Sequence, residues 1–389
     1  MLRVLLLGVG TVWSFPARAG DETAAVQFVE KSGGRVFLSD GAVTGVDLSG
    51  AKTFTDAGLK ELSLFAGLTN LNLTNTQVTD AALKDVARFP KLTVLNVSYT
   101  QITDEGLREI AGLTELTDLV LDYTKVSGSG LKHLAALTKL RTLSLGSKIV
   151  TDAGLRGLVG VRGLRQLDLR ETSVTDAGLK EIAPLSELKT LMLVNAPVTG
   201  PGLKDLALLT KLQFLFLSGT RITGDGLSEL TGLKSLRLLE LGGTPLTDAG
   251  LKQLAGFDTL GHLGLSNTKV TGAGLKELAA LKQLSGLDLG STKITDADLK
   301  EIAALTNLTG LTMRDTPVTD AGVRNLAPLT KLRRLNLTHT KVTNACAKTL
   351  ATFKHLTSVD LHQTDVTEEG GKELKAALPN CQFIISQRK

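Results

Sequence analysis

The sequence is poor in cysteine and aromatic residues, and it has no long apolar run. Its 389 residues include two cysteines, one tryptophan and two tyrosines. Two cysteines are too few for a disulfide framework. Cys346 and Cys381 either pair or are buried separately, and the sequence leaves both outcomes open. No apolar run approaches the roughly 20 residues of a membrane-spanning helix, so a disulfide scaffold and a membrane-spanning protein are both excluded.

Neither sign of charge dominates the chain. The formal net charge is +5, and it falls to +3 if Arg3 and Arg18 are removed with an N-terminal segment. An imbalance this small does not indicate a protein that binds nucleic acid. We therefore predict no nucleic-acid partner.

The first 19 residues have the pattern of a secretory signal peptide. Residues 1–3 carry a positive charge, residues 4–15 are apolar, and residues 17–19 form a small-x-small cleavage site. A buried N-terminal strand is the alternative, but the segment does not alternate as a half-buried strand should. We predict cleavage after Ala19 and export, so that the mature protein is secreted, periplasmic or held in the cell envelope.

One stretch of sequence organises the rest of the chain. Residues 92–115 read LTVLNVSYTQITDEGLREIAGLTE, and variants return every 24 residues from Leu68 to Leu356. A slightly longer copy begins at Val43, which makes fourteen. The shared template is L-x-x-L-x-L-x-x-T-x-V/I-T-D-x-G-L-x-x-L/I-A-x-L-x-x. A period of this length with this leucine pattern is typical of a solenoid of stacked repeats.

Each copy divides into a strand and a short helix. Leu95 and Val97 alternate with Val94 and Asn96, as side chains do along a strand with one buried face. Parallel strands stack about 4.8 Å apart whereas helices need about 10 Å, so the stack must curve with its strands inside. We predict an α/β right-handed solenoid, shaped as a horseshoe, with a parallel sheet on the concave face and short helices on the convex face. The positions predicted to face the core are Leu92, Leu95, Val97, Ile102, Leu107, Ile110 and Leu113.

The repeats run without a linker, and the segments that flank them depart from the template. We expect a signal peptide at 1–19, an N-terminal cap at 20–42, fourteen repeats at 43–381, and a C-terminal strand with a polar tail at 382–389. A cap is expected because the first repeat of a solenoid otherwise exposes its apolar face. Within it, Ala25, Phe28 and Val29 have helical spacing, and residues 35–38 can form a strand.

Three small or polar positions recur, and we interpret all three as structural. The position of Thr100 is threonine in eleven of thirteen copies, and a buried hydroxyl there can bond the nearby backbone. The position of Thr103 is threonine or serine in all fourteen copies, which suits a helix N-cap, and the acid that often follows suits the helix dipole. The position of Gly106 is glycine in eleven of fourteen copies, which is expected to let neighbouring helices approach.

The recurring acid also raises a metal hypothesis. A ladder of aspartates such as Asp104, Asp152 and Asp176 would suit calcium. Four copies break this ladder with glycine: Gly128, Gly200, Gly224 and Gly272. We therefore predict no metal site and no cofactor.

The template resembles leucine-rich repeat proteins with a helical convex side, particularly the cysteine-containing type found in F-box substrate receptors. Where that type has cysteine after L-x-x-L-x-L-x-x, this chain has Thr76, Thr100 and Thr124, and residues 102–107 match its I-T-D-x-G-L segment. The 24-residue period is also similar to exported bacterial leucine-rich repeat proteins. The resemblance covers nearly the whole mature chain. It implies the solenoid fold but not a particular partner, and no F-box, kinase, ligase or nuclease segment accompanies the repeats.

Concave positions are free of the core requirement, so recognition of a ligand should show there. Most of them carry small or polar residues, but Met192, Phe214, Phe216 and Leu238 form an apolar exception on three consecutive predicted strands. Clustered exposed aromatic residues make good binding anchors. Chance exposure in drifting repeats is the alternative.

Tyr99 and Tyr123 occupy the same position in adjacent copies, with Asp118 and Asp122 nearby. These tyrosines can stack on a sugar, hold a peptide or cover the sheet edge. A basic line at the strand starts would attract an anionic polymer or an acidic partner, or is simply a solvated face. The line consists of Arg141, Arg165, Lys189 and Arg237, with Lys139 and Lys211 beside it.

The search for catalytic residues finds one constellation. His339 and His362 fall on neighbouring predicted strands, with Asp315 one copy before His339. Such residues can form a metal site or an acid–base pair, but no nucleophile motif or phosphate-binding loop accompanies them. We predict no catalytic residue and no enzyme activity.

These features together predict an exported, non-enzymatic binding scaffold that recognises a protein partner through its concave face. Binding of a carbohydrate or cell-wall polymer by the tyrosines and the basic line is the alternative. A hydrolase or metal site at His339 and His362 is a third hypothesis. The candidate ligand-binding residues are Met192, Phe214, Phe216, Leu238, Tyr99, Tyr123 and Asp122.

Overall fold

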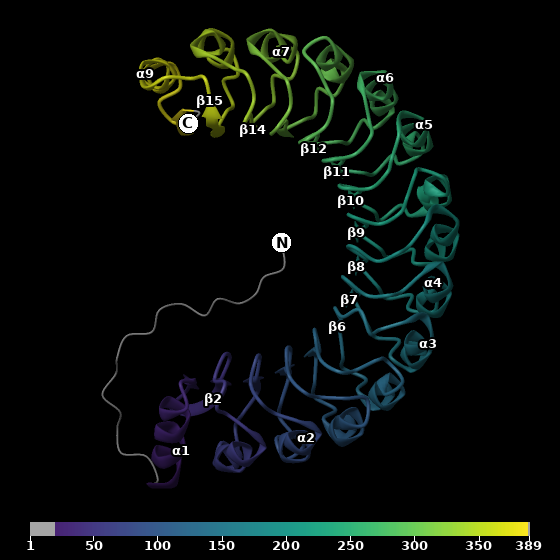
Figure 1. The fold of residues 1–389 in the computed structure, drawn as a ribbon, viewed down its shortest axis with the longest axis vertical. Coiled ribbons are helices and arrows are strands. Elements are labelled where there is room, and N and C mark those ends of the chain that lie inside the picture. The colour runs from purple at the N-terminus through teal and green to yellow at the C-terminus, as the bar shows by residue number, and fades with distance from the viewer. Residues whose placement is uncertain (1–19, 388–389) are drawn as a thin grey trace.

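The strands of residues 20–387, the part of the chain that the computed structural model describes, form one 16-stranded sheet in chain order. The sheet lines the inner side of an open arc and the helices lie along the outer side (Figure 1). The predicted horseshoe is therefore confirmed. The predicted signal peptide lies outside the described residues.

Most strands of the repeats are three residues long. The strands are β1 (Arg35–Ser39), β2 (Ala42–Asp47), β3 (Asn70–Asn72), β4 (Val94–Asn96), β5 (Asp118–Val120), β6 (Thr142–Ser144), β7 (Gln166–Asp168), β8 (Thr190–Met192), β9 (Phe214–Phe216), β10 (Leu238–Glu240), β11 (His262–Gly264), β12 (Gly286–Asp288), β13 (Gly310–Thr312), β14 (Arg334–Asn336), β15 (Ser358–Thr364) and β16 (Gln382–Gln387). β1 pairs with β2 in antiparallel fashion, and the pairs from β2 to β16 are parallel. Paired residues from β3 to β15 are 24 positions apart, for example Leu71 with Leu95, so equivalent positions stack into columns that run along the sheet.

The outer side is built from α-helices and 3₁₀ helices. The α-helices are α1 (Gly20–Lys31), α2 (Asp80–Val86), α3 (Asp152–Leu155), α4 (Asp176–Ile182), α5 (Asp248–Leu251), α6 (Gly272–Leu275), α7 (Asp320–Asn325), α8 (Ala347–Leu350) and α9 (Glu368–Ala377). The 3₁₀ helices are η1 (Asp56–Leu64), η2 (Gly106–Gly112), η3 (Leu131–Ala136), η4 (Arg156–Gly160), η5 (Gly200–Leu208), η6 (Leu227–Gly232), η7 (Lys252–Leu254), η8 (Lys276–Ala280), η9 (Asp298–Ala304) and η10 (Asn344–Cys346). The apolar residues Leu107, Ile110 and Leu113 recur every three residues, which is one 3₁₀ turn, although the same spacing is also compatible with an α-helix, as at α4.

The template leucines and their equivalents form a continuous core between the sheet and the helices. Leu95, Val97 and Ile102 are completely buried, as are the helix residues Leu107 and Ile110. Each buried leucine contributes about 1.5–3 kcal/mol relative to an exposed one. Because this core extends from one repeat to the next, the repeats depend on their neighbours for burial.

The segment before the repeats contains both elements that its sequence predicts. α1 buries Ala25 and Val29 against the first repeat, and β1 adds an antiparallel strand to β2. The ring of Phe28 lies 6.2 Å from that of Phe54, measured between centroids. No helix within residues 20–387 has the length and apolar character needed to cross a bilayer.

The two cysteines are free thiols and are buried separately, which decides between the two outcomes that the sequence left open. Cys346 ends η10, and Cys381 precedes β16. Burial, together with the nearby negative charge of Asp320, raises the pKa of the Cys346 thiol to about 12.

The threonine column at the position of Thr100 has the predicted backbone role. Thr100 is buried, and its hydroxyl donates to the carbonyl of Val97 at 2.6 Å. All eleven threonines of this column make the same bond in the described chain, each to the residue three positions earlier. The bond gives the carbonyl at the end of each strand a side-chain donor, which at Leu121 and Leu217 adds to a backbone N–H donor.

The acid after Thr103 has a role that the helix-dipole interpretation missed. Asp80 accepts hydrogen bonds from Thr103 of the next repeat, from its backbone N–H at 2.8 Å and its hydroxyl at 2.6 Å. We call this set of links between adjacent repeats the carboxylate ladder, although its last member is an asparagine. Its pairs in the described chain are Asp56–Thr79, Asp80–Thr103, Asp104–Ser127, Asp152–Thr175, Asp176–Thr199, Asp248–Thr271, Asp296–Thr319, Asp320–Thr343 and Asn344–Thr367.

The carboxylate ladder also explains the glycine column, for which we predicted helix approach. A Cβ at Gly106 would collide with the carboxylate of Asp80. Close approach of the backbone also occurs in this column. Gly154, which follows Gly128, lies against the backbone of Ser127, and Gly130 lies against the backbone of Asp104. One junction between repeats carries the exchange, because Gly272 replaces the aspartate of one repeat and Asp298 replaces the glycine of the next. Asp298 then accepts from the backbone N–H and hydroxyl of its own Thr295, at 2.8 and 2.7 Å.

Candidate binding surface

The apolar cluster predicted on the concave face is contiguous in the fold. Phe214 pairs with Leu238 on β10 and with Thr190 on β8, and Phe216 pairs with Met192. The side chain of Phe214 is 38% exposed, Phe216 and Leu238 are half-buried, and Met192 is only 9% exposed. Met192, which pairs with Phe216 on the neighbouring strand, therefore offers a partner little surface of its own.

The cluster has a small-residue surface along its C-terminal side. β11, β12 and β13 present Gly264, Gly286 and Gly310 to the concave side. Neighbouring side chains lean across these glycines, since a Cβ at Gly264 would collide with Glu240 and one at Gly286 with His262. His262 and Glu240 approach to 3.3 Å between Nε2 and Oε1. The apolar cluster is thus bordered by an ionisable pair, whose side chains cover the buried glycines Gly264 and Gly286.

Tyr99 and Tyr123 lie just after β4 and β5, in a column with left-handed backbone conformation. Their φ angles are 57° and 52°. Equivalent residues share this conformation in the described chain: Gly50, Asn75, Glu171, Asn195, Gly219, Gly243, Asn267, Ser291, Asp315, His339 and Gln363. Glycine and asparagine adopt it readily, whereas other residues pay roughly 1–2 kcal/mol. The two tyrosines therefore occupy positions that favour smaller residues.

The two tyrosine rings stack on each other at this rim of the sheet. Their centroids are 4.6 Å apart and their planes differ by 18°. Tyr99 is 53% exposed and Tyr123 is 42% exposed. Partial burial and a hydrogen bond with Glu171 raise the pKa of the Tyr123 hydroxyl.

Carboxylates surround the second tyrosine. Asp122 accepts hydrogen bonds from the Ser144 hydroxyl at 2.5 Å and from the Gly146 backbone N–H at 2.7 Å. Asp168 is buried and paired with Arg170 at 2.7 Å. Burial raises the pKa of Asp168, against the lowering effect of its contacts with Arg170. Asp118 starts β5, so it lies about 13 Å along the chain from Asp122 and is not part of this group.

The basic line is less available than its sequence suggests. Arg141 and Arg237 each donate from Nη1 to backbone carbonyls beside them, at 2.9–3.1 Å. Lys139 pairs with Glu115 at 2.6 Å, and Lys211 pairs with Glu187 at 2.5 Å. Arg165 and Lys189 lie between them at the equivalent strand starts. The charges of Lys139 and Lys211 are therefore compensated, and the guanidinium groups of Arg141 and Arg237 are engaged by backbone carbonyls.

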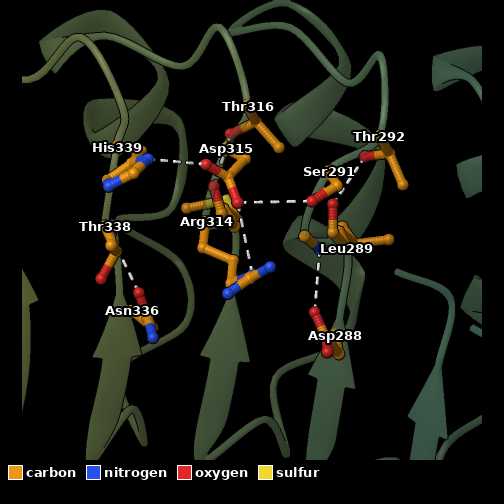
Figure 2. A network of polar contacts seen from close by, with 12 residues as sticks. Asp288, Leu289, Ser291, Thr292, Arg314, Asp315, Thr316, Asn336, Thr338 and His339 are labelled. Atoms are coloured by element: carbon orange, nitrogen blue, oxygen red, sulfur yellow. Dashed lines mark hydrogen bonds and ion pairs between the residues drawn. The ribbon is translucent and has the colours of Figure 1, made fainter. Parts of the chain in front are cut away.

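The histidine constellation divides between two separate contacts. Figure 2 shows Asp315 between His339 on one side and Ser291 on the other, with Arg314 alongside. His339 Nδ1 lies 2.9 Å from Asp315 Oδ1, whereas His362 Nδ1 lies 2.7 Å from the Ser386 hydroxyl. The two imidazole rings are 6.2 Å apart between centroids. No single imidazole therefore joins the serine to the carboxylate, as a triad requires.

Residues 20–387 contain no group of three or more histidine, cysteine, aspartate or glutamate side chains arranged to hold a metal ion. The ladder aspartates point at threonines of the next repeat, so each carboxylate has a partner without a cation.

Sequence reasoning missed several residues of this surface. Glu171 and His262 act through neighbours two repeats and one repeat away, at separations that a single copy does not reveal. Arg170 pairs with Asp168 within its own copy. The left-handed column did leave a signal, because glycine or asparagine recurs at its position in six copies. That signal identifies Tyr99 and Tyr123 as unusual for their backbone.

Comparison with known proteins gives matches to one type of fold. The sequence model of the family described as Leucine Rich repeat matches residues 90–111. An internalin from Listeria monocytogenes is similar in structure with a TM-score of 0.56 and 23% identity, covering 95% of this chain and 96% of that chain. A protein from Leptospira interrogans has a TM-score of 0.61 and 23% identity, covering 87% of this chain and 95% of that chain. No curated protein sequence matches. At these identities the likeness bears on the fold alone.

Proposed function

We propose, from the premise that this chain is a leucine-rich repeat solenoid, that it is an exported, non-enzymatic scaffold which binds a protein partner on its concave face. The fold supports binding because a solenoid presents an extended curved surface that needs no further folding to meet a partner. Export is supported by the signal-peptide pattern of residues 1–19.

The observation that carries this proposal is the register of β8, β9 and β10. It places Phe214, Phe216 and Leu238 side by side on a face that elsewhere carries mainly small or polar residues. The backbone beneath them is fixed by parallel pairing on both sides, so little conformational entropy is lost when a partner binds. Rigid, clustered aromatic side chains of this kind are the residues that dominate binding energy at protein interfaces.

The expected effect of removing the cluster is large. An anchoring aromatic residue typically contributes about 2 kcal/mol or more, which corresponds to about 30-fold in affinity. The double variant Phe214→Ser/Phe216→Ser should therefore weaken binding by at least this factor. The strand should survive, because neither residue belongs to the buried core cluster.

A quantitative crosslinking and capture experiment tests the proposal. The wild-type protein, the double variant and a control are presented to the envelope fraction of the exporting cell, and captured proteins are compared by mass spectrometry. The control is Leu208→Ser, which removes a side chain that is 66% exposed on the convex η5. A specific partner should be lost with the double variant and kept with the control. Equal capture by all three proteins would refute the concave site.

A further inference from the structure

The two stacked tyrosines present aromatic faces at a fixed place on the rim of the sheet. Their positions are set by the parallel pairing of β4 with β5, and their rings stack with a centroid distance of 4.6 Å. The face of an aromatic ring carries negative electrostatic potential and attracts cations. Both side chains keep substantial exposure while stacked, so their outer faces are accessible to a partner.

The polar groups beside Tyr123 are acceptors with uncompensated negative charge. Asp122 and Glu171 form no ion pair within residues 20–387, whereas the neighbouring Asp168 is neutralised by Arg170. Asp122 receives hydrogen bonds from Ser144 and Gly146, which orient its carboxylate but leave its charge uncompensated. Ionised carboxylates accept hydrogen bonds and cannot donate them. The site therefore combines two negative charges with two electron-rich rings.

We infer that Tyr99, Tyr123, Asp122 and Glu171 form a binding site for an organic cation, namely a guanidinium or ammonium side chain of the partner protein. The inference rests on the proposed function, since it assigns chemistry to that partner. A cation donates hydrogen bonds to both carboxylates and lies against the ring face. A sugar also stacks on tyrosine and its hydroxyls can donate to carboxylates, but it is neutral and leaves both negative charges without compensation, whereas a cation offsets them. The charge therefore favours a cation.

The distance between this site and the apolar cluster constrains the partner. Tyr123 follows β5 and Phe214 begins β9, so four strand spacings of about 4.8 Å, or about 19 Å, separate them across the sheet. Phe214 is equivalent to Asp118, so Tyr123 also lies about 16 Å further along the strand direction, and the two sites are about 25 Å apart. An extended chain covers about 3.3 Å per residue, so about eight residues span this distance. The partner segment should carry a basic residue about eight positions from an apolar residue. This spacing also places both contacts on one continuous stretch of chain.

The scarcity of aromatic residues supplies a selective probe. Tyr99 and Tyr123 are the only tyrosines in the chain, and the only tryptophan is Trp13. In a full chain with Trp13→Phe, tyrosine emission reports on this site alone. The probe ligand is acetyl-Arg-Arg-Arg-amide, and its matched control replaces each arginine with citrulline, which has nearly the same shape and no charge. We expect a saturable emission change with the arginine peptide and none with the citrulline peptide.

Affinity is compared by the fluorescence anisotropy of a dye-labelled copy of the arginine peptide. Tyr123→Asn should weaken binding about tenfold, and Asp122→Asn should weaken it by a similar factor. Tyr123→Asn should fold well, because asparagine already occupies the left-handed column at Asn75, Asn195 and Asn267. Asn267→Gly in the same column, six repeats away, is the control and should bind as the wild type does.

Three results would overturn the inference. They are no saturable binding of the arginine peptide, equal binding of the citrulline peptide, and an emission change produced by chitobiose but not by arginine. The last would assign the site to carbohydrate. Failure here is separable from failure of the proposed function, because Phe214→Ser/Phe216→Ser should leave binding of the arginine peptide unchanged.

Discussion

Exchanging Asp80 and Gly106 for each other should leave the solenoid nearly as stable as the native protein, although either change alone should destabilise it. The two residues share one space, because a Cβ at Gly106 would collide with the carboxylate of Asp80. The native chain already contains the exchanged arrangement at Gly272 and Asp298. In that repeat the carboxylate reaches the threonine from within its own repeat, as in a capping box.

The magnitudes follow from the contacts. Asp80→Gly removes two hydrogen bonds to a carboxylate, each worth about 1.5 kcal/mol at the low end of the range for charged groups, and so should cost about 3 kcal/mol. Gly106→Asp brings a second carboxylate against the first, and overpacking with like-charge repulsion should cost about as much. In the double variant the new Asp side chain at position 106 replaces the lost acceptor of Thr103. The interaction energy of the cycle should then be at least about 2 kcal/mol in favour of the pair.

Urea unfolding of the four proteins, followed by circular dichroism, measures this cycle. The slopes must agree between variants for the midpoints to be compared as free energies. Gly178→Asp in a chain that keeps Asp152 is a second test of the same clash. If the double variant loses the sum of the two single losses, the carboxylate and the glycine do not share a space and the explanation of both columns is wrong.

Three further predictions concern buried or paired groups. Burial and Glu171 raise the folded-state pKa of Tyr123, so the stability that this group contributes is complete below pH 10 and is lost as the pH rises through the folded-state pKa. Absorbance at 295 nm should show one tyrosine that ionises at a higher pH than the other, and Glu171→Gln should lower that pH. Thr100→Val should cost about 1 kcal/mol by removing the bond to Val97, which urea unfolding measures. Cys346, with a pKa of about 12, should resist iodoacetamide at pH 8 in the native protein and react after unfolding, as mass spectrometry will show.

The fold could be predicted because the pattern of buried apolar residues recurs in every copy. Leu95 and Ile102, for example, are buried as their spacing predicts. The period of 24 residues is also the pairing register of the sheet, so the columns could be read directly from the sequence. A substitution in one copy does not obscure the template, because the other copies keep the common residue. The threonine column was interpreted correctly for this reason.

The candidate site was harder to predict because its contacts run between copies. Met192 looked like an exposed anchor, but neighbouring side chains bury it. Glu171 reaches Tyr123 from two repeats away, past the small Ser147. Such contacts depend on which variable residues lie side by side in adjacent copies, and the repeat template gives only the residues that the copies share. The concave proposals therefore rest on the structure more than on the repeat.

Interruptions of the carboxylate ladder bear on how the solenoid comes apart. In a stack of repeats, cooperativity depends on the coupling between nearest neighbours, so a weak junction divides the array into separate unfolding units. Gly200 and Gly224 remove the ladder contact from two successive junctions, those between the repeats of β8, β9 and β10. Heat or mechanical tension should therefore separate the molecule there into two blocks. A partner bound at Phe214 would contact repeats on both sides of these junctions and so restore coupling between the two blocks.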